Sequence, residues 1–224
     1  EIMPSLVGSE MCIRDRTIPG LISKTGNARF VYDAYRRLIM MYADVVMEKA
    51  EQKDNVHIRE KLEKILDTVK KKNKIKTDSG LTVENLKDII IKFKKMIKNN
   101  LGEEFPDSCE TQLWGAVAAV FKSWNGTRAI QYRKIENIPN HWGTAVNIQS
   151  MVFGNLGQTS GTGVAFTRNP SNGENNLYGE WLENAQGEDV VAGIRTPHPI
   201  NEFSKTTQTK NSITQIDTFP AVYR

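Results

Sequence analysis

The chain has 224 residues, of which 39% are hydrophobic and 25% are charged, a composition ordinary for a folded globular protein with one large domain or two small ones. No apolar run approaches the about 18 residues that span a bilayer, and two cysteines are too few for a disulfide framework, which favours a reducing compartment over secretion. The net charge of +4 is uneven, because residues 58–100 hold 13 lysines and arginines against 6 acids. A case for nucleic-acid binding must therefore rest on that segment alone.

The first hundred residues are predicted to be mainly helical. Apolar positions recur at helical spacing through residues 27–50 and again through residues 58–72. The polar run KKKNKIKTDSG at 70–80 predicts an exposed connection. Thr82 is a candidate N-cap, because a threonine side chain there accepts a backbone hydrogen bond from the first turn. The helix after it should end at 99–102. Its expected buried face comprises Leu86, Ile89, Ile90, Phe93 and Ile97.

After Pro106 the sequence predicts one more long helix, over residues 113–124, and a short one over 128–133. Farther along, the apolar period falls to two, as in half-buried strands. A polar tail after residue 201 is expected to be a loop. The predicted strands lie at about 143–152, 164–166 and 177–184.

The segment SGTG at 160–163 lies between two strand candidates and precedes a set of acidic residues. Small residues let backbone N–H groups approach a phosphate, and carboxylates hold the Mg²⁺ that accompanies it, so a nucleotide site is one interpretation. The alternatives are an ordinary β-turn with glycines at positive φ, and a solvated strand edge. SGTG is neither a Walker A loop nor a dinucleotide fingerprint. The acidic set is Glu180, Glu183, Glu188 and Asp189.

The remaining charged residues allow structural interpretations. Arg36 and Arg37 are expected on an exposed helix face or in a buried ion pair. The lysine run at 70–76 lacks the interleaved aromatic residues that stack on bases, which favours a solvated loop over a nucleic-acid site. The histidines stand apart from one another and from cysteine, so they form no metal-ligand or triad spacing. They are His57, His141 and His198.

Three long segments carry a resemblance to a known family. They read KTGNARFVYDAYRRLIMMYADVVME, WGAVAAVFKSWNGTRAIQYRKIENIP and GTAVNIQSMVFGNLGQTSGTGVAFTRNPSNGE, the last continued by YGEWLENAQGEDVVAGIRTPHPI. From about residue 17 to 224 the chain resembles the pyruvate, phosphate dikinase family, in its N-terminal nucleotide-binding domain of the ATP-grasp type. The fit is loose in the lysine-rich middle.

This resemblance implies an α+β fold, an ATP-grasp-like fragment with a helical subdomain and a mainly antiparallel sheet portion. It implies a parent enzyme that converts ATP, phosphate and pyruvate into AMP, pyrophosphate and phosphoenolpyruvate with Mg²⁺ and a monovalent cation. A phosphohistidine domain of the same full-length chain would be the partner, and family members are often homo-oligomeric. The implied segments are a non-native or disordered prefix at 1–16, the helical subdomain at 17–108, the sheet portion at 109–204, and a loop with the start of a further helix at 205–224.

The resemblance also implies nucleotide-binding residues. Arg37 matches an arginine for the nucleotide phosphates, and Thr162 matches a position close to the terminal phosphate. Glu188 and Asp189 match acids of the nucleotide site. Residues 149–152, with Gln149, Met151 and Val152, fall where ATP-grasp proteins pass the adenine edge. The resemblance assigns no catalytic residue within this chain and leaves the metal ligands open.

Several family motifs are missing. The chain lacks the early glycine-lysine segment, the SVRSG stretch, the LQTRN motif and a TSHAA-type segment, so none of its histidines is the phosphocarrier. Residues 1–16, EIMPSLVGSEMCIRDR, look like translated adapter sequence and match no signal or transit peptide. We therefore expect a fragment that is inactive by itself, from a cytoplasmic or an organellar (plastid or glycosomal) enzyme. The alternatives are a basic helical nucleic-acid-binding module at 58–100 and a non-catalytic fragment.

Overall fold

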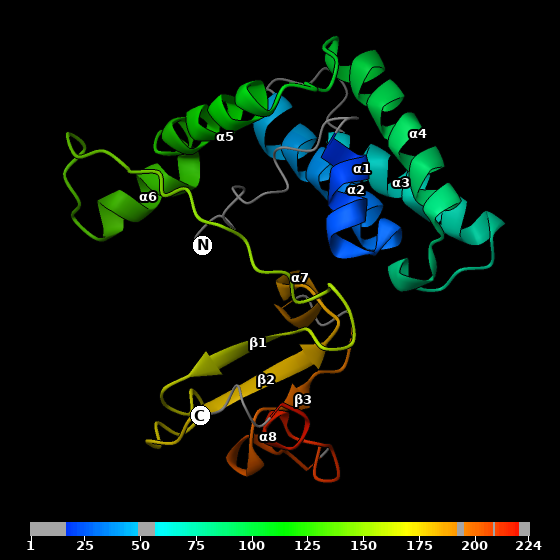
Figure 1. Cartoon of the computed structure of the whole chain (residues 1–224). Coiled ribbons are helices and arrows are strands. Elements are labelled where there is room, and N and C mark those ends of the chain that lie inside the picture. Colours follow the sequence, from blue (N-terminus) through cyan, green and yellow to red (C-terminus); the bar gives the residue numbers. More distant parts are fainter. Residues whose placement is uncertain (1–16, 49–56, 192–194, 208, 220–224) are drawn as a thin grey trace. The chain divides into compact units, whose positions relative to one another are not determined.

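The structure is a computed structural model that describes residues 17–48, 57–191, 195–207 and 209–219 (Figure 1). The chain divides into two compact units, residues 1–151 and 152–224. The predicted prefix at 1–16 lies outside the described residues, and the four-segment division predicted from the sequence stays a prediction. Among the described helices, none combines the length and the apolar character needed to cross a membrane.

The first unit is mainly helical in its described residues up to Ile135, as the sequence predicts, and its elements follow in chain order. They are α1 (Thr17–Thr25), α2 (Ala28–Tyr42), the π-helix η2 (Ala43–Met47), α3 (Ile58–Lys72), the 3₁₀ turn η3 (Asp78–Gly80), α4 (Val83–Leu101), α5 (Cys109–Ser123) and α6 (Thr127–Ile135).

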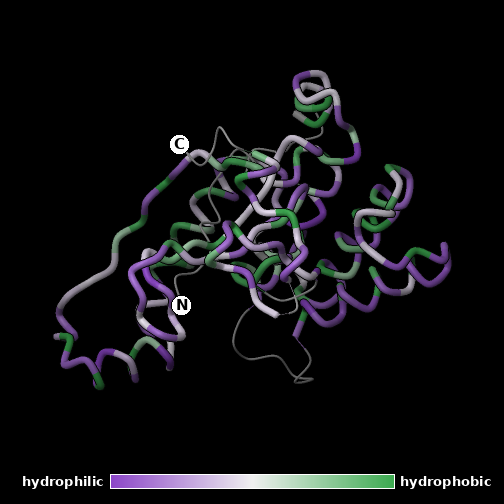
Figure 2. Tube along the Cα trace, turned by 90° about the horizontal axis from the view of Figure 1, so that it is seen from below, coloured by the Kyte–Doolittle hydropathy of each residue, from purple (hydrophilic) through white to green (hydrophobic). Residues whose placement is uncertain are grey.

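Helix α4 packs on both α2 and α3. Thr82 is the predicted N-cap: its hydroxyl accepts a hydrogen bond from the Asn85 backbone N–H at 3.2 Å, and the Asn85 side-chain oxygen accepts one from the Thr82 backbone N–H. Gly102 ends the helix at φ 74°, a left-handed conformation that glycine adopts without strain. Hydrophobic and hydrophilic positions are interspersed along the helices in Figure 2, as amphipathic packing requires. The expected face of α4 is buried in full: Leu86, Ile89, Ile90, Phe93 and Ile97.

Helix α5 buries a polar residue and exposes large apolar ones. The face turned to the rest of the first unit holds Gln112 and Ala116, which are fully buried, whereas Phe121 is 51% exposed and Trp114 is 62% exposed. The Gln112 side chain is accommodated because its amide donates to the Pro106 carbonyl at 2.6 Å. Helix α5 contacts the π-helix η2.

The second unit contains a three-stranded antiparallel sheet in the order β1-β2-β3. Strand β1 pairs with β2 so that Thr162 lies opposite Leu182. One buried hydrophobic cluster of this unit comprises Leu182, Ala185 and Val190, with Val164 against it, and Trp181 and Ile200 are buried as well. The elements are β1 (Gly161–Phe166), β2 (Tyr178–Glu183), α7 (Gly187–Val191), β3 (His198–Pro199), η4 (Glu202–Ser204) and α8 (Gln215–Thr218). The α+β class and the antiparallel sheet are confirmed.

Two local interpretations are wrong, and a third holds in part. Residues 143–152, all described, form no strand, because their alternating apolar residues have no described strand to pair with. The SGTG segment is no β-turn: Gly161–Gly163 lies inside β1, and neither glycine has positive φ. Of the acidic set, Glu180 and Glu183 lie on β2, as the strand-edge alternative allowed, whereas Glu188 and Asp189 lie on α7.

Candidate functional site

Thr162 lies at the start of β1, where three connections hold the end of the sheet together. Its hydroxyl donates a hydrogen bond to the Ala185 carbonyl at 2.7 Å. The Asn184 N–H donates to the Ser160 carbonyl at 2.8 Å, and the Ala185 N–H donates to the Gly154 carbonyl at 3.0 Å. The segment before β1 and the turn after β2 are therefore joined beside Thr162.

Gly154 fits against Thr162 because it has no side chain. A Cβ at Gly154 would overlap the Thr162 hydroxyl oxygen, and it would lie 2.5 Å from the Ala185 carbonyl oxygen and 2.8 Å from that of Gly161. Gly154 is buried. The backbone thus approaches the start of β1 more closely than any other residue type permits.

The acidic residues occupy different positions around the same turn. Asp189 is half-buried, and its carboxylate accepts a hydrogen bond from the Gln186 N–H at 2.9 Å, which caps the start of α7. Glu180 is exposed on β2, and the side chain of Glu188 lies outside the described residues. Residues 185–189 thus connect Ala185, which accepts the Thr162 hydroxyl, to Asp189. Within the described residues, no group of three or more histidines, cysteines or acids is placed to hold a metal ion.

Residues 149–152, the predicted adenine edge, form an exposed extended segment. Met151 is 37% exposed and Val152 is 92% exposed. Among the described residues, no backbone–backbone hydrogen bond is made within 143–152 or to that segment. The main-chain N–H and C=O groups of this segment therefore do not pair with another strand.

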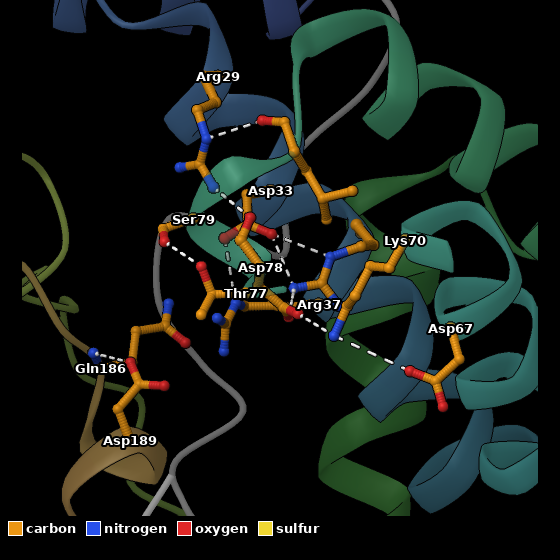
Figure 3. A network of polar contacts seen from close by, with 12 residues as sticks. Arg29, Asp33, Arg37, Asp67, Lys70, Thr77, Asp78, Ser79, Gln186 and Asp189 are labelled. Carbon is orange, nitrogen blue, oxygen red and sulfur yellow. Dashed lines mark hydrogen bonds and ion pairs between the residues drawn. The ribbon is translucent and has the colours of Figure 1, made fainter. Parts of the chain in front are cut away.

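Arg37, the predicted phosphate contact, belongs to an ion-pair network in the first unit (Figure 3). Asp33 stands one helical turn before the Arg36–Arg37 pair on α2 and contacts both. Its Oδ1 accepts from Arg36 Nε at 2.9 Å and from Arg36 Nη2 at 2.7 Å, while its Oδ2 accepts from Arg37 Nε at 3.3 Å. The Arg36 side chain is 3% exposed and that of Arg37 is 17% exposed, so Arg36 has the buried ion pair that the sequence allowed.

Asp78 on η3 extends this network toward the basic segment. Its carboxylate contacts Arg36 Nη2 at 3.1 Å and Lys70 Nζ at 2.7 Å. Arg29 donates to the Asp78 carbonyl at 2.6 Å and to the Leu81 carbonyl at 3.0 Å. Burial by itself would raise the pKa of Asp78, but the Lys70 hydrogen bond and the charges of Arg36, Lys70 and Arg37 outweigh it and lower that pKa. The carboxylate is therefore ionised in the folded protein at neutral pH.

The basic surplus of residues 58–100 is partly balanced within the first unit. Lysines of α4 pair with acids on the same helix and on the segment after it, at distances of 2.5–2.9 Å. Lys61 of α3 donates to the Asn100 side chain at 2.7 Å. The ion pairs, unlike the contact to the neutral Asn100 amide, reduce the positive charge that a polyanion would meet. The α4 pairs are Lys92–Asp88, Lys94–Asp107 and Lys98–Glu104.

Sequence reasoning missed the partners of the predicted residues. Asp33 was detectable, because an acid three and four positions before two arginines predicts helix ion pairs. Asp78 and Gly154 had no such local signal, since their contacts come from elements distant in the chain. The resemblance assigns Arg37 of the first unit and Thr162 of the second to one nucleotide site, and this assignment stays a prediction.

Comparison with known proteins gives consistent matches. The family described as "Pyruvate phosphate dikinase, AMP/ATP-binding domain" matches residues 56–219. The chain is 52% identical over 204 residues to pyruvate, phosphate dikinase of Clostridium symbiosum, covering 90% of this chain and 22% of that protein. The Rhizobium meliloti (strain 1021) protein of the same name is 48% identical over 205 residues, covering 91% and 22%. The chloroplastic protein of Flaveria trinervia is 50% identical over 200 residues, covering 88% and 20%. The chain spans about a fifth of the length of these relatives.

Proposed function

The chain belongs to the pyruvate, phosphate dikinase AMP/ATP-binding domain family, which confirms the resemblance in its sequence, and on this premise we propose that it forms part of the ATP site of such an enzyme. The observation that carries the proposal is the family match at 56–219, which includes SGTG, QGED and the extended segment at 149–152. The parent enzyme would be a phosphotransferase that converts ATP, phosphate and pyruvate into AMP, pyrophosphate and phosphoenolpyruvate.

In this proposal the adenine edge contacts residues 149–152. Gln149, Met151 and Val152 would present main-chain N–H and C=O groups to the base. The absence of backbone–backbone hydrogen bonds among the described residues of this stretch supports the assignment, because a strand inside a sheet would have those groups occupied. The exposed Met151 and Val152 side chains would cover the faces of the base.

The phosphates would be held by a hydroxyl and a fixed cation. Thr162 has one hydroxyl hydrogen, and the Ala185 carbonyl accepts it in the structure. Donation to a terminal phosphate therefore requires that this hydrogen turn away from Ala185, in exchange for a charge-assisted bond. Arg37 would supply the cation, since a guanidinium suits phosphate oxygens.

Mg²⁺ would accompany ATP. It would be held by the phosphates together with Glu188 or Asp189, because magnesium in nucleotide sites takes few protein ligands, and these are carboxylates. The carboxylate of Asp189 fits this chemistry, and the bound ion would neutralise charge on the polyphosphate. A monovalent cation would be a further requirement of the parent enzyme.

The partners of this site would come from the parent protein. A phosphohistidine domain would accept the phosphoryl group, and the parent would be a homo-oligomer in the cytoplasm or in an organelle such as a plastid or glycosome. By themselves the 224 residues would bind Mg²⁺-ATP weakly and would not turn it over.

Calorimetric titration of the purified chain with ATP, with and without Mg²⁺, tests the proposal. We expect binding that requires Mg²⁺ and is weakened about threefold to tenfold by Asp189→Asn, which retains an acceptor for the Gln186 N–H. The matched control is Glu180→Gln, an equal change of charge at an exposed position of β2, which should leave the affinity unchanged.

Two results would contradict this function. One is equal weakening by Asp189→Asn and Glu180→Gln, which would indicate a general charge effect without a site. The other is RNA binding by the chain with a steep salt dependence and no binding of Mg²⁺-ATP, which would favour a basic module at residues 58–100.

A further inference from the structure

We propose that Asp33 is a positioning residue for Arg37: it fixes the guanidinium of Arg37 and confines Arg36 to a structural role, so that Arg37 is the member of the pair presented to the nucleotide phosphates. This inference rests on the proposed function, which places Arg37 at the phosphates. It adds a residue that touches no substrate and acts through its neighbour.

One carboxylate serves both arginines, and its two oxygens are divided between them. Oδ1 of Asp33 takes the Nε and Nη2 of Arg36 in a forked contact at 2.9 and 2.7 Å, and Oδ2 takes the Nε of Arg37 at 3.3 Å. The Asp33 side chain is 5% exposed, so water competes little for these bonds. The forked contact holds Arg36 through two of its nitrogens.

The contact to Arg37 is made at Nε, the guanidinium nitrogen nearest the aliphatic stem. A hydrogen bond there restricts rotation of the planar group about its last bonds and so fixes the direction of the terminal nitrogens, which form the forked face that suits phosphate. Fixing this direction before the ligand arrives reduces the ordering cost of binding. Asp33 would therefore strengthen a phosphate contact without making it.

Arg36 is retained by a second carboxylate. Its Nη2 also reaches Asp78 Oδ2 at 3.1 Å, and Lys70 occupies the other oxygen of Asp78 at 2.7 Å (Figure 3). With Asp33 and Asp78 both in contact, Arg36 is enclosed at 3% exposure, while Arg37 keeps 17%. The difference in exposure selects which arginine meets a ligand.

The first test measures, in the absence of nucleotide, how firmly the Arg37 guanidinium is held. In the whole 224-residue chain, solvent exchange of the Arg37 Nε–H is followed by NMR. Asp33→Asn should accelerate this exchange about tenfold or more, because the carboxylate that accepts the hydrogen is lost. Asp67→Asn is the matched control: it removes the same charge from the network, at a residue whose contact is Lys70 at 3.9 Å. The proposal is overturned if the Arg37 Nε–H exchanges as slowly in Asp33→Asn as in the unsubstituted chain and in Asp67→Asn. This outcome does not depend on what the chain binds.

The second test reads the consequence for phosphate recognition. Affinities for Mg²⁺-ATP and for AMP are compared in Asp33→Asn, in Arg37→Ala and in the double variant. We expect Asp33→Asn to lower the affinity for ATP about threefold to tenfold more than the affinity for AMP. In the Arg37→Ala background, Asp33→Asn should lower neither affinity further. An undiminished effect of Asp33→Asn in the Arg37→Ala background would overturn the positioning role.

Failure of the proposed function gives a different pattern. If Arg37→Ala leaves the ratio of the affinities for ATP and AMP unchanged, Arg37 is not a phosphate contact. The inference then fails together with that assignment, even if Asp33→Asn accelerates exchange of the Arg37 Nε–H. Because a buried charge is altered, Asp33→Asn can prevent folding, which circular dichroism reveals. Asp33→Glu then replaces it: this variant keeps the charge, moves the oxygens by one methylene, and should show the same accelerated exchange and the same selective loss for ATP.

Discussion

Replacing Gly154 by alanine is the sharpest test of how the end of the sheet is built. The added Cβ would overlap the Thr162 hydroxyl oxygen and would lie 2.5 Å from the Ala185 carbonyl oxygen, so the segment before β1 must move away. Such overpacking costs about 1–3 kcal/mol, and loss of the hydrogen bond between Thr162 and Ala185 adds about 1 kcal/mol. We expect a loss of about 2–4 kcal/mol in the free energy of unfolding of the second unit.

Hydrogen exchange of the β1 amides measures this loss locally. At one factor of ten for each 1.4 kcal/mol, exchange of the amides of Gly161–Phe166 should accelerate by about 30- to 700-fold. Gly157→Ala is the control, because no heavy atom lies within 4 Å of a Cβ there, and it should change the free energy by less than about 0.5 kcal/mol. Equal exchange in the two variants would refute the close packing of Gly154 on Thr162.

Three further predictions concern charge, the prefix and turnover. Burial would raise the pKa of Asp78, but Lys70 and Arg36 outweigh burial and lower that pKa in the folded state. The ionised Asp78 therefore stabilises the fold at pH values above its unfolded pKa of about 3.9. This contribution is lost as the pH falls through the folded pKa. The midpoint of urea unfolding, measured from pH 6 to pH 3, should fall less steeply with pH for Asp78→Asn than for the unsubstituted chain. Equal slopes for the two chains would contradict the role of Asp78. Deleting residues 1–16 should change the melting temperature by less than about 2 °C, whereas a drop of several degrees would show that the prefix belongs to the fold. Incubation with γ- and β-labelled ATP and a separately made phosphohistidine domain should leave that domain unlabelled, and label well above a no-enzyme control would show a working site.

The helical unit was largely predictable because its signals are local. The apolar spacing of α4, the Thr82 cap and the stop at Gly102 each involve residues within one or two turns of one another, so the chain needs no distant partner to specify them. Helix α5 was less predictable, since its buried face was decided by which side meets η2, and the structure buries Gln112 there.

The second half of the chain shows where prediction from local patterns fails. Alternating apolar residues at 143–152 resemble a strand, but a strand exists by pairing, and among the described residues that segment has no pairing partner. The SGTG segment reads as a turn because glycines favour turns, yet Gly161 and Gly163 lie in β1 against Trp181. Glycine composition alone does not separate a turn from a close approach between strands.

By itself the sequence determined the family, the helical first unit, the antiparallel second unit and the candidate residues Arg37, Thr162 and Asp189. These follow from residue identity and from contacts between near neighbours in the chain. Only the tertiary structure decided that Asp33 divides its oxygens between two arginines, that Asp78 joins Arg36 to Lys70, and that Gly154 closes on Thr162. Asp78 and Arg36 are 42 residues apart in the chain, whereas Asp78 and Lys70 are eight apart, as are Gly154 and Thr162. Even where spacing allows a contact, packing determines which oxygen meets which donor and which side chain stays exposed.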